Sequence, residues 1–399
     1  MAIQERNRTR IAAVVFAGFC AFLTLFAPQP LLPMLAVALG KPEGAIASYV
    51  ITPATLAVAL AAPFAGVIAD HLGRKRVIVW SALLLSVPTV LTASANGMGQ
   101  LLVWRALQGV FTPGIFAVTI AYINEEWEEG AGSAMAAYVG GTVMGGFTGR
   151  VVAALAAAEF SWRWSFVALG VLDALMGVAI WVWLPEGRHF KRAVRTSTAR
   201  AMSRHLRNPR LAATYAVGFC VLFTLMAAFS YVTFYLAAPP FRLSTQLLGL
   251  TFVVYLVGAA VTPVAGRSID RLGHRFALSM AYCGGIAGIC LTLIAWLPAV
   301  LLGLALCCTG VFIAHSSASS YIGTVAHEAR AAAVGLYVMF YYVGGSAGAA
   351  LPGYLWHSGG WPGCVALVVA VQALTIVLAL VFWRPEPQPA PQPAVAAAD

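Results

Sequence analysis

Long apolar runs alternate with short polar gaps along almost the whole chain. Charged and turn residues divide it into about twelve apolar segments, most of them as long as the ~20 residues that an α-helix needs to cross a bilayer. The runs are apolar on all sides and lack the alternation of a membrane β-barrel, so we expect helices. The expected spans lie near 11–39, 44–69, 76–95, 98–124, 131–156, 163–185, 210–237, 243–269, 275–295, 297–322, 330–356 and 360–383.

The composition agrees with this pattern and indicates an integral membrane protein. Hydrophobic residues make up 61% of the chain and charged residues 10%, whereas a soluble domain carries roughly 25% charged residues. The net charge of +10 does not indicate nucleic-acid binding, because Lys and Arg lie in the gaps, where they set topology and contact lipid. The seven cysteines lie inside apolar segments without a CxxC pair. We therefore expect no disulfide, no metal site and no cofactor.

One motif occurs twice, about 200 residues apart, and internal repeats of this kind are typical of secondary transporters. Pro63–Ile78 reads PFAGVIADHLGRKRVI, and Pro263–Leu278 reads PVAGRSIDRLGHRFAL. Each copy closes one apolar segment, turns through a charged loop and opens the next. The residues that we expect to form a gate in these two copies are Gly66, Asp70, Gly73, Arg74 and Lys75, and Gly266, Asp270, Gly273 and Arg275.

Basic residues gather in alternate gaps, and the gap after the sixth segment holds the largest number of them. The positive-inside rule therefore places both termini and this gap in the cytoplasm of a multi-pass inner (cell) membrane protein. We expect an N-terminal bundle of six helices over 1–185, a basic linker over 186–209, a C-terminal bundle of six helices over 210–384 and a disordered tail over 385–399. An amphipathic helix in the linker would lie on the inner leaflet.

These features together resemble the major facilitator superfamily over essentially the whole chain. The segment from Gly66 to Lys75 is similar to the signature loop between helices 2 and 3 of that superfamily. A closer resemblance is to the bacterial YnfM-type transporters of the drug:proton-antiporter-like branch. It is carried by Gln29-Pro30-Leu-Leu-Pro33, Leu184-Pro185-Glu186-Gly-Arg188-His189-Phe190, Ala314-His315-Ser316-Ser-Ala-Ser319-Ser320, Tyr341-Tyr342-Val-Gly344-Gly345-Ser346 and the pair Trp162-Arg163.

The resemblance implies an all-α membrane fold, with twelve transmembrane helices in two pseudo-symmetric six-helix bundles. It also implies a central cavity, lined mainly by helices 1, 4, 7 and 10, and alternating access to it. Two positions depart from the family's pattern. The antiporter signature of helix 5 lacks its proline and reads Gly145-Gly146-Phe-Thr-Gly149-Arg150, and the second loop has His274 at its first basic position. The first departure bears on whether the protein is an antiporter.

Three residues inside apolar segments are candidates for proton coupling. Arg105 resembles the arginine of the helix 4 signature that is linked to coupling. We expect no other basic residue at its depth in the first half of the chain. The alternative is an arginine that snorkels to the outer interface. Asp173 lies in the middle of a span, and the alternative is a hydrogen-bonded acid in the outer ring of helices. His315 titrates near neutral pH, and the alternative is a neutral side chain in a network with nearby serines.

The candidate cavity residues lie on the first, seventh and tenth helices. Prolines on both sides of Gln29 interrupt the backbone ladder and free carbonyls, as at many transporter sites, although the same prolines can simply bend a helix. Tyr231 and Tyr235 are spaced i and i+4 and share one helix face; tyrosines at a membrane interface give the same pattern. Ser316 and Ser319 follow the histidine of the tenth helix and complete the set.

The two copies of the loop are expected to close the cytoplasmic end. In the family's fold the start of the eleventh helix, near Arg330–Ala333, approaches Asp70 when this end is shut. The repeat implies the same for Asp270 and the start of the fifth helix, near Ala131–Ser133. A helix N-terminus carries free N–H groups and a partial positive charge, which favour a carboxylate. We also expect the acidic run 125–129 to pair with the basic residues of the first loop.

We therefore expect a monomeric secondary active transporter of a small organic solute that works by alternating access and exports its substrate by coupling to protons. The alternatives are a proton-independent facilitator and an uptake symporter of the same fold. No convergent set of nucleophile, base or metal ligands indicates an enzyme, and no Walker motif indicates ATP drive. Gly344-Gly345-Ser346-Ala347-Gly348 matches G-x-S-x-G, but it lies in an apolar segment, where small residues favour helix packing.

Overall fold

The computed structural model describes residues 2–127, 130–187, 198–261, 272–326 and 328–383, and every regular element within them is a helix. The first half contains α1 (Ala2–Leu23), the 3₁₀ turn η1 (Gln29–Leu31), α2 (Leu32–Ala38), α3 (Glu43–Leu72), α4 (Arg74–Thr92), α5 (Met98–Glu126), α6 (Ala131–Glu159) and α7 (Trp162–Trp183). The second half contains α9 (Pro209–Ala237), α10 (Thr245–Thr251), α12 (His274–Leu291), α13 (Leu297–Val325), α14 (Arg330–Ala350) and α15 (Pro352–Phe382). Between the halves in the chain lies the short α8 (Thr198–Arg207).

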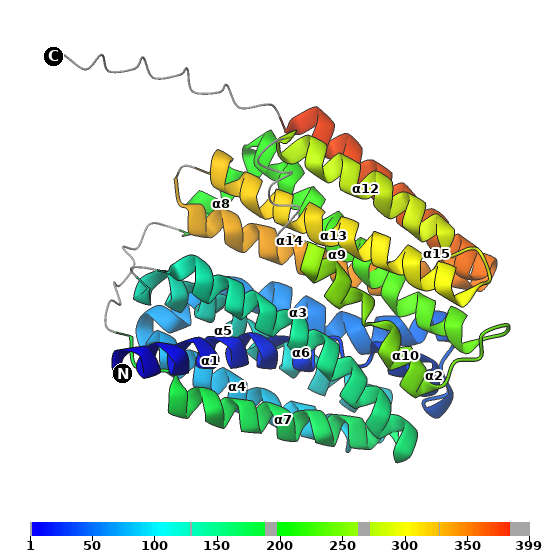
Figure 1. Ribbon diagram of the computed structural model, residues 1–399, viewed down its shortest axis with the longest axis horizontal. Helices are drawn as coiled ribbons and strands as arrows, with labels where there is room; N and C mark the ends of the chain where they lie inside the picture. The colour runs from blue at the N-terminus through cyan, green and yellow to red at the C-terminus, as the bar shows by residue number, and fades with distance from the viewer. Residues whose placement is uncertain (1, 128–129, 188–197, 262–271, 327, 384–399) are drawn as a thin grey trace.

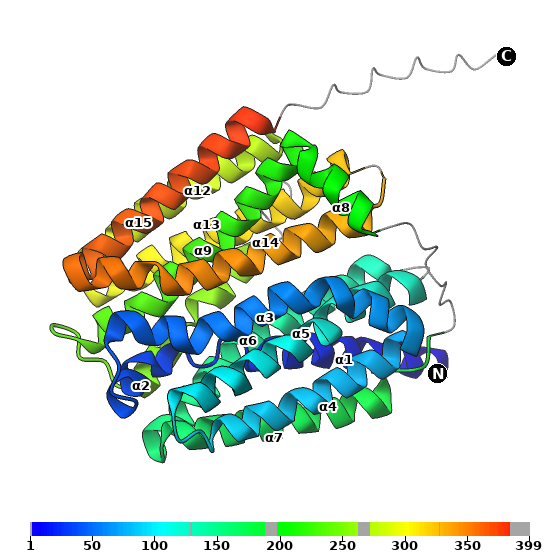
Figure 2. The same cartoon turned by 180° about the vertical axis from the view of Figure 1, so that it is seen from behind.

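The helices form two bundles that lie side by side (Figure 1). In the first bundle α1 packs against α6, and α5 packs against both α3 and α4. In the second bundle α9 packs against α14 and α15, and α12 packs against α13. The bundles meet where α3 lies beside α14 (Figure 2) and where α10 lies beside α6. The expected all-α fold of two pseudo-symmetric bundles is confirmed.

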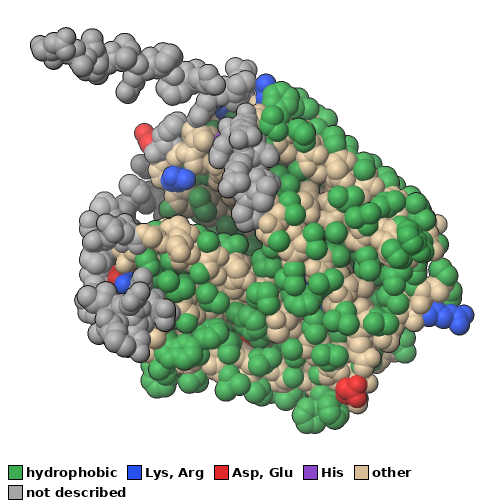
Figure 3. All heavy atoms as spheres, viewed as in Figure 1, with side chains coloured by type: hydrophobic (Ala, Val, Ile, Leu, Met, Phe, Trp, Pro, Cys, Tyr) green, Lys and Arg blue, Asp and Glu red, His purple; other side chains and the backbone are tan. Residues whose placement is uncertain are grey.

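The described helices cover most of the expected membrane spans. Nine of them are long and apolar enough to cross a membrane, and three shorter apolar stretches lie at Thr9–Leu23, Gln29–Ala38 and Thr245–Val261. Large apolar side chains such as Leu60 and Trp80 are each 61% exposed, and hydrophobic side chains dominate the face drawn in Figure 3. A surface this apolar is stable in lipid rather than in water. The chain is a multi-pass membrane protein.

Segment 11–39 is interrupted, as its prolines predict: α1 ends at Leu23 and the chain re-enters helical structure only at Gln29. The boundary expected between the last two spans is wrong. The eleventh helix ends at Ala350 rather than near residue 356, and α15 contains a kink at Gly360 (φ +55°, ψ −145°). A glycine at position 360 is typical of a boundary between two helices, but here the chain is helical on both sides of the kink. Part of the span 243–269 and the whole tail 385–399 lie outside the described residues.

The two loop motifs share one backbone conformation at their matched glycines. Gly73, between α3 and α4, has φ +91° and ψ 144°, and Gly273, before α12, has φ +79° and ψ 156°. Only glycine adopts this region without strain. The repeat seen in the sequence is therefore also a repeat of the turn. The gate candidates Gly266 and Asp270 lie outside the described residues.

Glycines bring α1 into backbone contact with α6, and the second bundle repeats this contact between α9 and α14. A Cβ atom on Gly145 would lie 2.1 Å from the Phe19 carbonyl oxygen, and one on Gly344 would lie 2.0 Å from the Phe219 carbonyl oxygen. Helices approach this closely in membranes when small residues line the contact. The G-x-S-x-G match at 344–348 is thus a packing surface within a helix.

Candidate functional site between the two bundles

The first membrane segment breaks before Pro28, and Arg105 on α5 occupies the break. Pro28 has no N–H to offer the Thr24 carbonyl, so the helical ladder stops there. Arg105 donates from Nη1 to Thr24 O at 3.3 Å and from Nη2 to Leu25 O at 2.6 Å. The backbone oxygens that the helix break leaves free are therefore satisfied by a guanidinium group.

The remaining contacts of Arg105 also belong to the first bundle. Its Nε donates to Val50 O at 2.8 Å, and its Nη1 donates to Gln108 Oε1. Gln108 in turn donates from Nε2 to Thr92 Oγ1 at 3.0 Å. Arg105 is 0% exposed, so it does not snorkel to the interface. Within the described residues it anchors the broken helix to α3 and α5 through neutral acceptors.

A second buried arginine, which is not among the residues predicted from the sequence, lies where the bundles meet. Arg150 on α6 is 2% exposed. Its Nε and Nη2 donate to Gln29 Oε1 at 2.9 and 2.7 Å, and its Nη1 donates to Gly146 O at 2.6 Å. Gln29 Nε2 donates across the interface to Ser230 Oγ on α9 at 3.1 Å. The broken first segment thus places Gln29 between a cation of one bundle and a hydroxyl of the other.

Aromatic rings surround the Arg150 guanidinium. Its Cζ lies 4.7 Å from the ring centroid of Phe252 and 4.6 Å from that of Tyr255, both of the second bundle, and 5.6 Å from that of Phe26. Cation–π contacts of this kind stabilise a desolvated guanidinium. We call Arg150, Gln29, Phe252 and Tyr255 the arginine cage.

The arginine cage corrects one sequence-based expectation. Arg105 lies seven residues after the start of α5 at Met98, and Arg150 lies nine residues before the end of α6 at Glu159. At 1.5 Å per residue, the two arginines lie about 10 and 14 Å from the same end of the bundle. Arg105 is therefore not the only basic residue at that depth. The signal that would have identified Arg150 is the one used for Arg105, a permanent charge inside an apolar segment.

His315 on α13 contacts tyrosines rather than the neighbouring serines. Its Nδ1 lies 3.0 Å from the Tyr337 hydroxyl, and its ring centroid lies 4.8 Å from that of Tyr341, both on α14. His315 and Ser316 are partly exposed, and Ser319 is exposed. The candidates of the tenth helix therefore share one region of α13.

The two candidate tyrosines lie near the end of the bundles where α3 begins. Tyr231 is 0% exposed and donates to Gly44 O at 3.0 Å and to Ala349 O at 2.9 Å. It therefore joins the start of α3 to the second bundle. Tyr235 is partly exposed and stacks on Trp361 at a centroid distance of 5.6 Å. Periodicity correctly predicts their shared helix, but in this conformation Tyr231 is buried in a contact between the bundles.

Asp173 lies inside the first bundle, away from the contact between the bundles. It is 0% exposed on α7. Its nearest donors are the Cys20 thiol, with Sγ 3.5 Å from Oδ1, and the Thr89 hydroxyl, with Oγ1 3.4 Å from Oδ2. No cation is paired with it in the described part of the chain, so an ionised carboxylate here would be costly.

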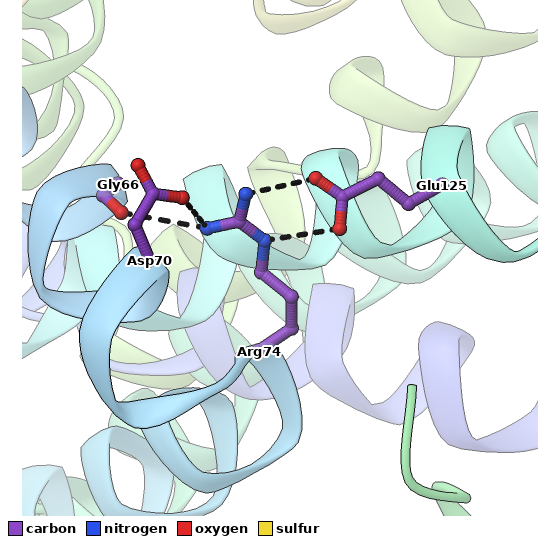
Figure 4. Close-up of polar contacts among 4 residues, drawn as sticks. All are labelled: Gly66, Asp70, Arg74 and Glu125. Carbon is purple, nitrogen blue, oxygen red and sulfur yellow. Dashed lines mark hydrogen bonds and ion pairs between the residues drawn. The ribbon is translucent and has the colours of Figure 1, made fainter. Parts of the chain in front are cut away.

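The first loop motif forms an ion-pair network (Figure 4). Arg74 Nη1 lies 2.7 Å from Asp70 Oδ1, and the same guanidinium donates to Glu125 at 3.1 and 2.8 Å through Nε and Nη2. The expected pairing of the acidic run with the loop is therefore confirmed for Arg74. Lys75 lies 3.9 Å from Glu186. In the second copy, the Arg275 guanidinium lies over its neighbouring phenylalanine ring, 4.5 Å from the centroid.

The bundles contact each other at one end and in the middle. We call the end where the Gly73 turn lies the basic end and the opposite end the far end. At the far end Trp356 Nε1 donates to Glu43 Oε2 at 3.1 Å. Toward the middle Thr55 Oγ1 lies 2.8 Å from Ser346 Oγ. Figure 3 shows the surface hollowed between the two bundles, and Figure 1 shows them diverging toward the basic end.

Comparison with known proteins agrees with this architecture. The profile of the Major Facilitator Superfamily matches residues 14–349. The chain is 33% identical to the inner membrane transport protein YnfM of Escherichia coli K12, covering 93% of this chain and 89% of that protein. It is 32% identical to the uncharacterized MFS-type transporter YybF of Bacillus subtilis 168, covering 92% and 90% respectively.

A solved structure gives the same fold. The nucleoside transporter NupG superposes with a TM-score of 0.73 at 16% sequence identity, covering 94% of this chain and 98% of that one. An identity this low shows the fold alone. The family profile and the sequence relatives show in addition that this is a secondary transporter and not an enzyme. The chain belongs to the Major Facilitator Superfamily.

Proposed function

We propose that the protein works by alternating access and exports a small organic solute in exchange for protons. The observation that carries this proposal is the one-sided contact between the bundles. Side chains join them at the far end and in the middle, and the hollow lies between them where they diverge. Two bundles that rock around a central site expose that site to one side of the membrane at a time.

The basic end is proposed to face the cytoplasm. Arg74 and Lys75 lie at this end, and so does α8, whose last turn contains Arg204 and Arg207. An excess of Lys and Arg in short loops is retained on the cytoplasmic side. With this orientation both termini are cytoplasmic, and the described conformation is open to the cytoplasm. The proposed units are the bundles over 1–185 and 210–384, the linker over 186–209 and the tail over 385–399, in a monomer.

His315 is the preferred proton carrier. It is partly exposed, hydrogen-bonds to Tyr337 and lies on a helix expected to line the cavity. Asp173 is fully enclosed by α1, α4 and α7, so a proton would reach it only through a rearrangement of the first bundle. Histidine suits proton exchange because its unperturbed side chain gains and loses a proton near neutral pH. The environment of His315 would then have to differ between the two facing states.

The two loop motifs are proposed to hold the basic end shut in the other state. In the described conformation Asp70 pairs with Arg74, while α14 begins at Arg330 after Ala329, which provides no side-chain cap. The first N–H groups of α14 therefore have no side-chain acceptor at their cap. Approach of this helix end to Asp70 would give the carboxylate charge-assisted hydrogen bonds that are lost when the bundles part.

Transport in proteoliposomes tests the proposal. A panel of organic solutes is first screened for thermal stabilisation of the purified protein, and each binder is then assayed with an imposed pH gradient and an internal pH dye. We expect accumulation against the solute gradient, with protons moving in the opposite direction. Accumulation with protons moving in the same direction would support the uptake symporter. Equilibration that ignores the pH gradient would support the facilitator.

A further inference from the structure

We propose that the Arg150 guanidinium binds the anionic group of the transported solute, so that the substrates are organic anions. This inference rests on the proposed transport function and names its substrate class. It starts from the charge of the arginine cage. In the described structure no carboxylate is paired with Arg150, whose three hydrogen bonds go to the neutral oxygens of Gln29 and Gly146. A guanidinium group keeps its charge, and a buried charge without a counterion is costly.

Within the described residues, some N–H groups of the Arg150 guanidinium form no hydrogen bond. A guanidinium group has five N–H bonds, and the three hydrogen bonds of Arg150 leave part of this fork free. Tyr255 supplies an independent observation. Its ring lies 4.6 Å from the Arg150 Cζ, and its buried hydroxyl has no hydrogen-bond partner. A cation with spare N–H bonds beside an unpaired hydroxyl is the donor set that a carboxylate or a similar oxyanion requires.

Gln29 occupies the position that a ligand oxygen would take. Its single Oε1 accepts from both Nε and Nη2 of Arg150, on the edge of the guanidinium that binds carboxylates in two-pronged pairs. A carboxylate offers two oxygens and a full charge to the same edge, whereas the amide offers one oxygen and a dipole. The amide and the rings therefore hold the charge while no anion is bound, and an anion displaces them.

The cage also lies at the contact between the two bundles, which alternating access would open and close. Arg150 and Gln29 belong to the first bundle, and Phe252 and Tyr255 belong to the second. A rocking motion that separates α10 from α6 removes the rings from the guanidinium and exposes it. The other charged candidates do not compete for this role, because Arg105 is enclosed by acceptors of its own bundle and Asp173 lies inside that bundle.

Equilibrium binding to the full chain in detergent tests the inference. The probes are matched triplets of a carboxylate, its neutral amide and the corresponding ammonium, such as benzoate, benzamide and benzylammonium. We expect several carboxylates to stabilise the wild type against thermal unfolding, with much smaller shifts for the matched amides and ammonium ions. Equal or larger shifts for the neutral or cationic members, or no shift with any carboxylate, would overturn the inference.

Variants locate the site. Arg150→Gln should weaken carboxylate binding about tenfold or more, because it removes the charge and the two-pronged edge. Arg150→Lys should retain part of the binding, and Tyr255→Phe should weaken it severalfold. Comparing each carboxylate with its own amide in the same variant cancels a general loss of stability. Carboxylate selectivity that survives Arg150→Gln would overturn the inference, and if that variant does not fold, the wild-type triplets and Arg150→Lys decide.

Failure of the proposed anion site can be distinguished from failure of the proposed transport function. Carboxylates that bind through Arg150 but are not moved across proteoliposomes would overturn the proposed transport and leave the binding site. A neutral or cationic solute that is accumulated would overturn the inference and leave the transport.

Discussion

Arg105 Nη2 donates a hydrogen bond of 2.6 Å to the Leu25 carbonyl, an oxygen at the break of the first membrane segment. An α-helix through this point would supply that oxygen with an N–H four residues later. The Gln29 N–H instead donates to the Phe26 carbonyl at 3.1 Å. The helix break and the buried arginine therefore depend on each other.

Arg105→Ala should lower the stability of the protein as well as its transport. The change leaves the buried carbonyl oxygens of Thr24 and Leu25 at the helix break without their donor and removes a hydrogen bond to Val50 O. Hydrogen bonds to charged groups contribute about 1.5–3 kcal/mol each in soluble proteins, and interhelical ones in membranes average ~0.6 kcal/mol, so we expect a loss of about 2–4 kcal/mol. Unfolding in a denaturing detergent measures it.

The matched control for Arg105 is Arg163→Ala. Arg163 lies at the start of α7, donates one hydrogen bond of 3.2 Å to Ala95 O and lies over the Trp162 ring. We expect it to cost less than about 1 kcal/mol. An Arg105→Ala variant as stable as this control would contradict the anchoring role, and Arg105→Lys should restore only part of the stability because it lacks the planar fork.

Gly73→Ala and Gly66→Ala should distinguish an effect on the conformation of the turn from an effect on closure of the basic end. Gly73 has φ +91°, so a side chain there strains the described conformation by about 1–3 kcal/mol. Gly66 is helical, and a Cβ added to it meets no atom within 4 Å. Gly66→Ala should leave thermal stability unchanged and reduce only the population closed at the basic end. If both variants destabilise the protein equally, Gly66 has a structural role that the described conformation does not show.

Glu125→Gln should weaken the loop network without unfolding the protein. Arg74 binds Glu125 through two nitrogens, and the Glu125 side chain is 26% exposed. Partly exposed ion pairs contribute about 0.2–1 kcal/mol. A double-mutant cycle with Arg74→Gln should give a coupling energy in that range that falls as salt is raised. A coupling energy of zero at low salt would show that the pair does not stabilise this state.

Substitutions of His315 and Asp173 should show which of the two side chains is accessible to protons. His315→Ala should reduce transport and change its pH profile, because it removes the proposed proton carrier. Tyr337→Phe should reproduce part of that change, since it removes only the hydroxyl 3.0 Å from His315 Nδ1. Asp173→Asn should be milder, because that carboxyl is enclosed by its own bundle. Transport assays between pH 5 and 8 measure these profiles. If only Asp173→Asn inactivates transport, this ranking is wrong.

The sequence was sufficient to predict the elements and the repeat. Apolar length predicts the spans, the prolines around Gln29 predict the helix break, and the matched glycines predict the two turns. These are local properties of the chain. Local pattern also predicts that the acidic run meets the first loop, because both lie at the same ends of neighbouring helices, and Arg74 does pair with Glu125.

Contacts between distant segments were harder to predict. The residues of the arginine cage come from α6, η1 and the second bundle, and no periodicity indicates that Phe252 and Tyr255 meet Arg150. The spacing of Tyr231 and Tyr235 gives a shared helix face but not the direction in which that face points. For His315, neighbours in the sequence suggested a serine network, whereas the partner in space is Tyr337 on another helix.

Asp70 is proposed to hold the basic end shut in the other facing state. A carboxylate at a helix N-terminus contributes about 0.3–2 kcal/mol, which corresponds to a roughly twofold to thirtyfold shift between two states. Asp70→Asn should therefore favour the conformation open at the basic end, without preventing substrate binding. Asp270→Asn should act in the same direction through the matching contact.

Spin labels at Leu72 and Val334 report this opening most directly. The two positions lie at the basic ends of α3 and α14 and are 57% and 43% exposed, and the exposed native cysteines Cys283 and Cys290 are replaced beforehand. Arg76→Gln serves as the control, because Arg76 lies in the same loop motif, is exposed and is not among the gate residues. In a condition where the wild type is mostly closed at this end, pulsed double electron–electron resonance should show Asp70→Asn moving population from the short to the long distance, while the control retains the wild-type distribution. Identical distance distributions in Asp70→Asn and the wild type would contradict the account.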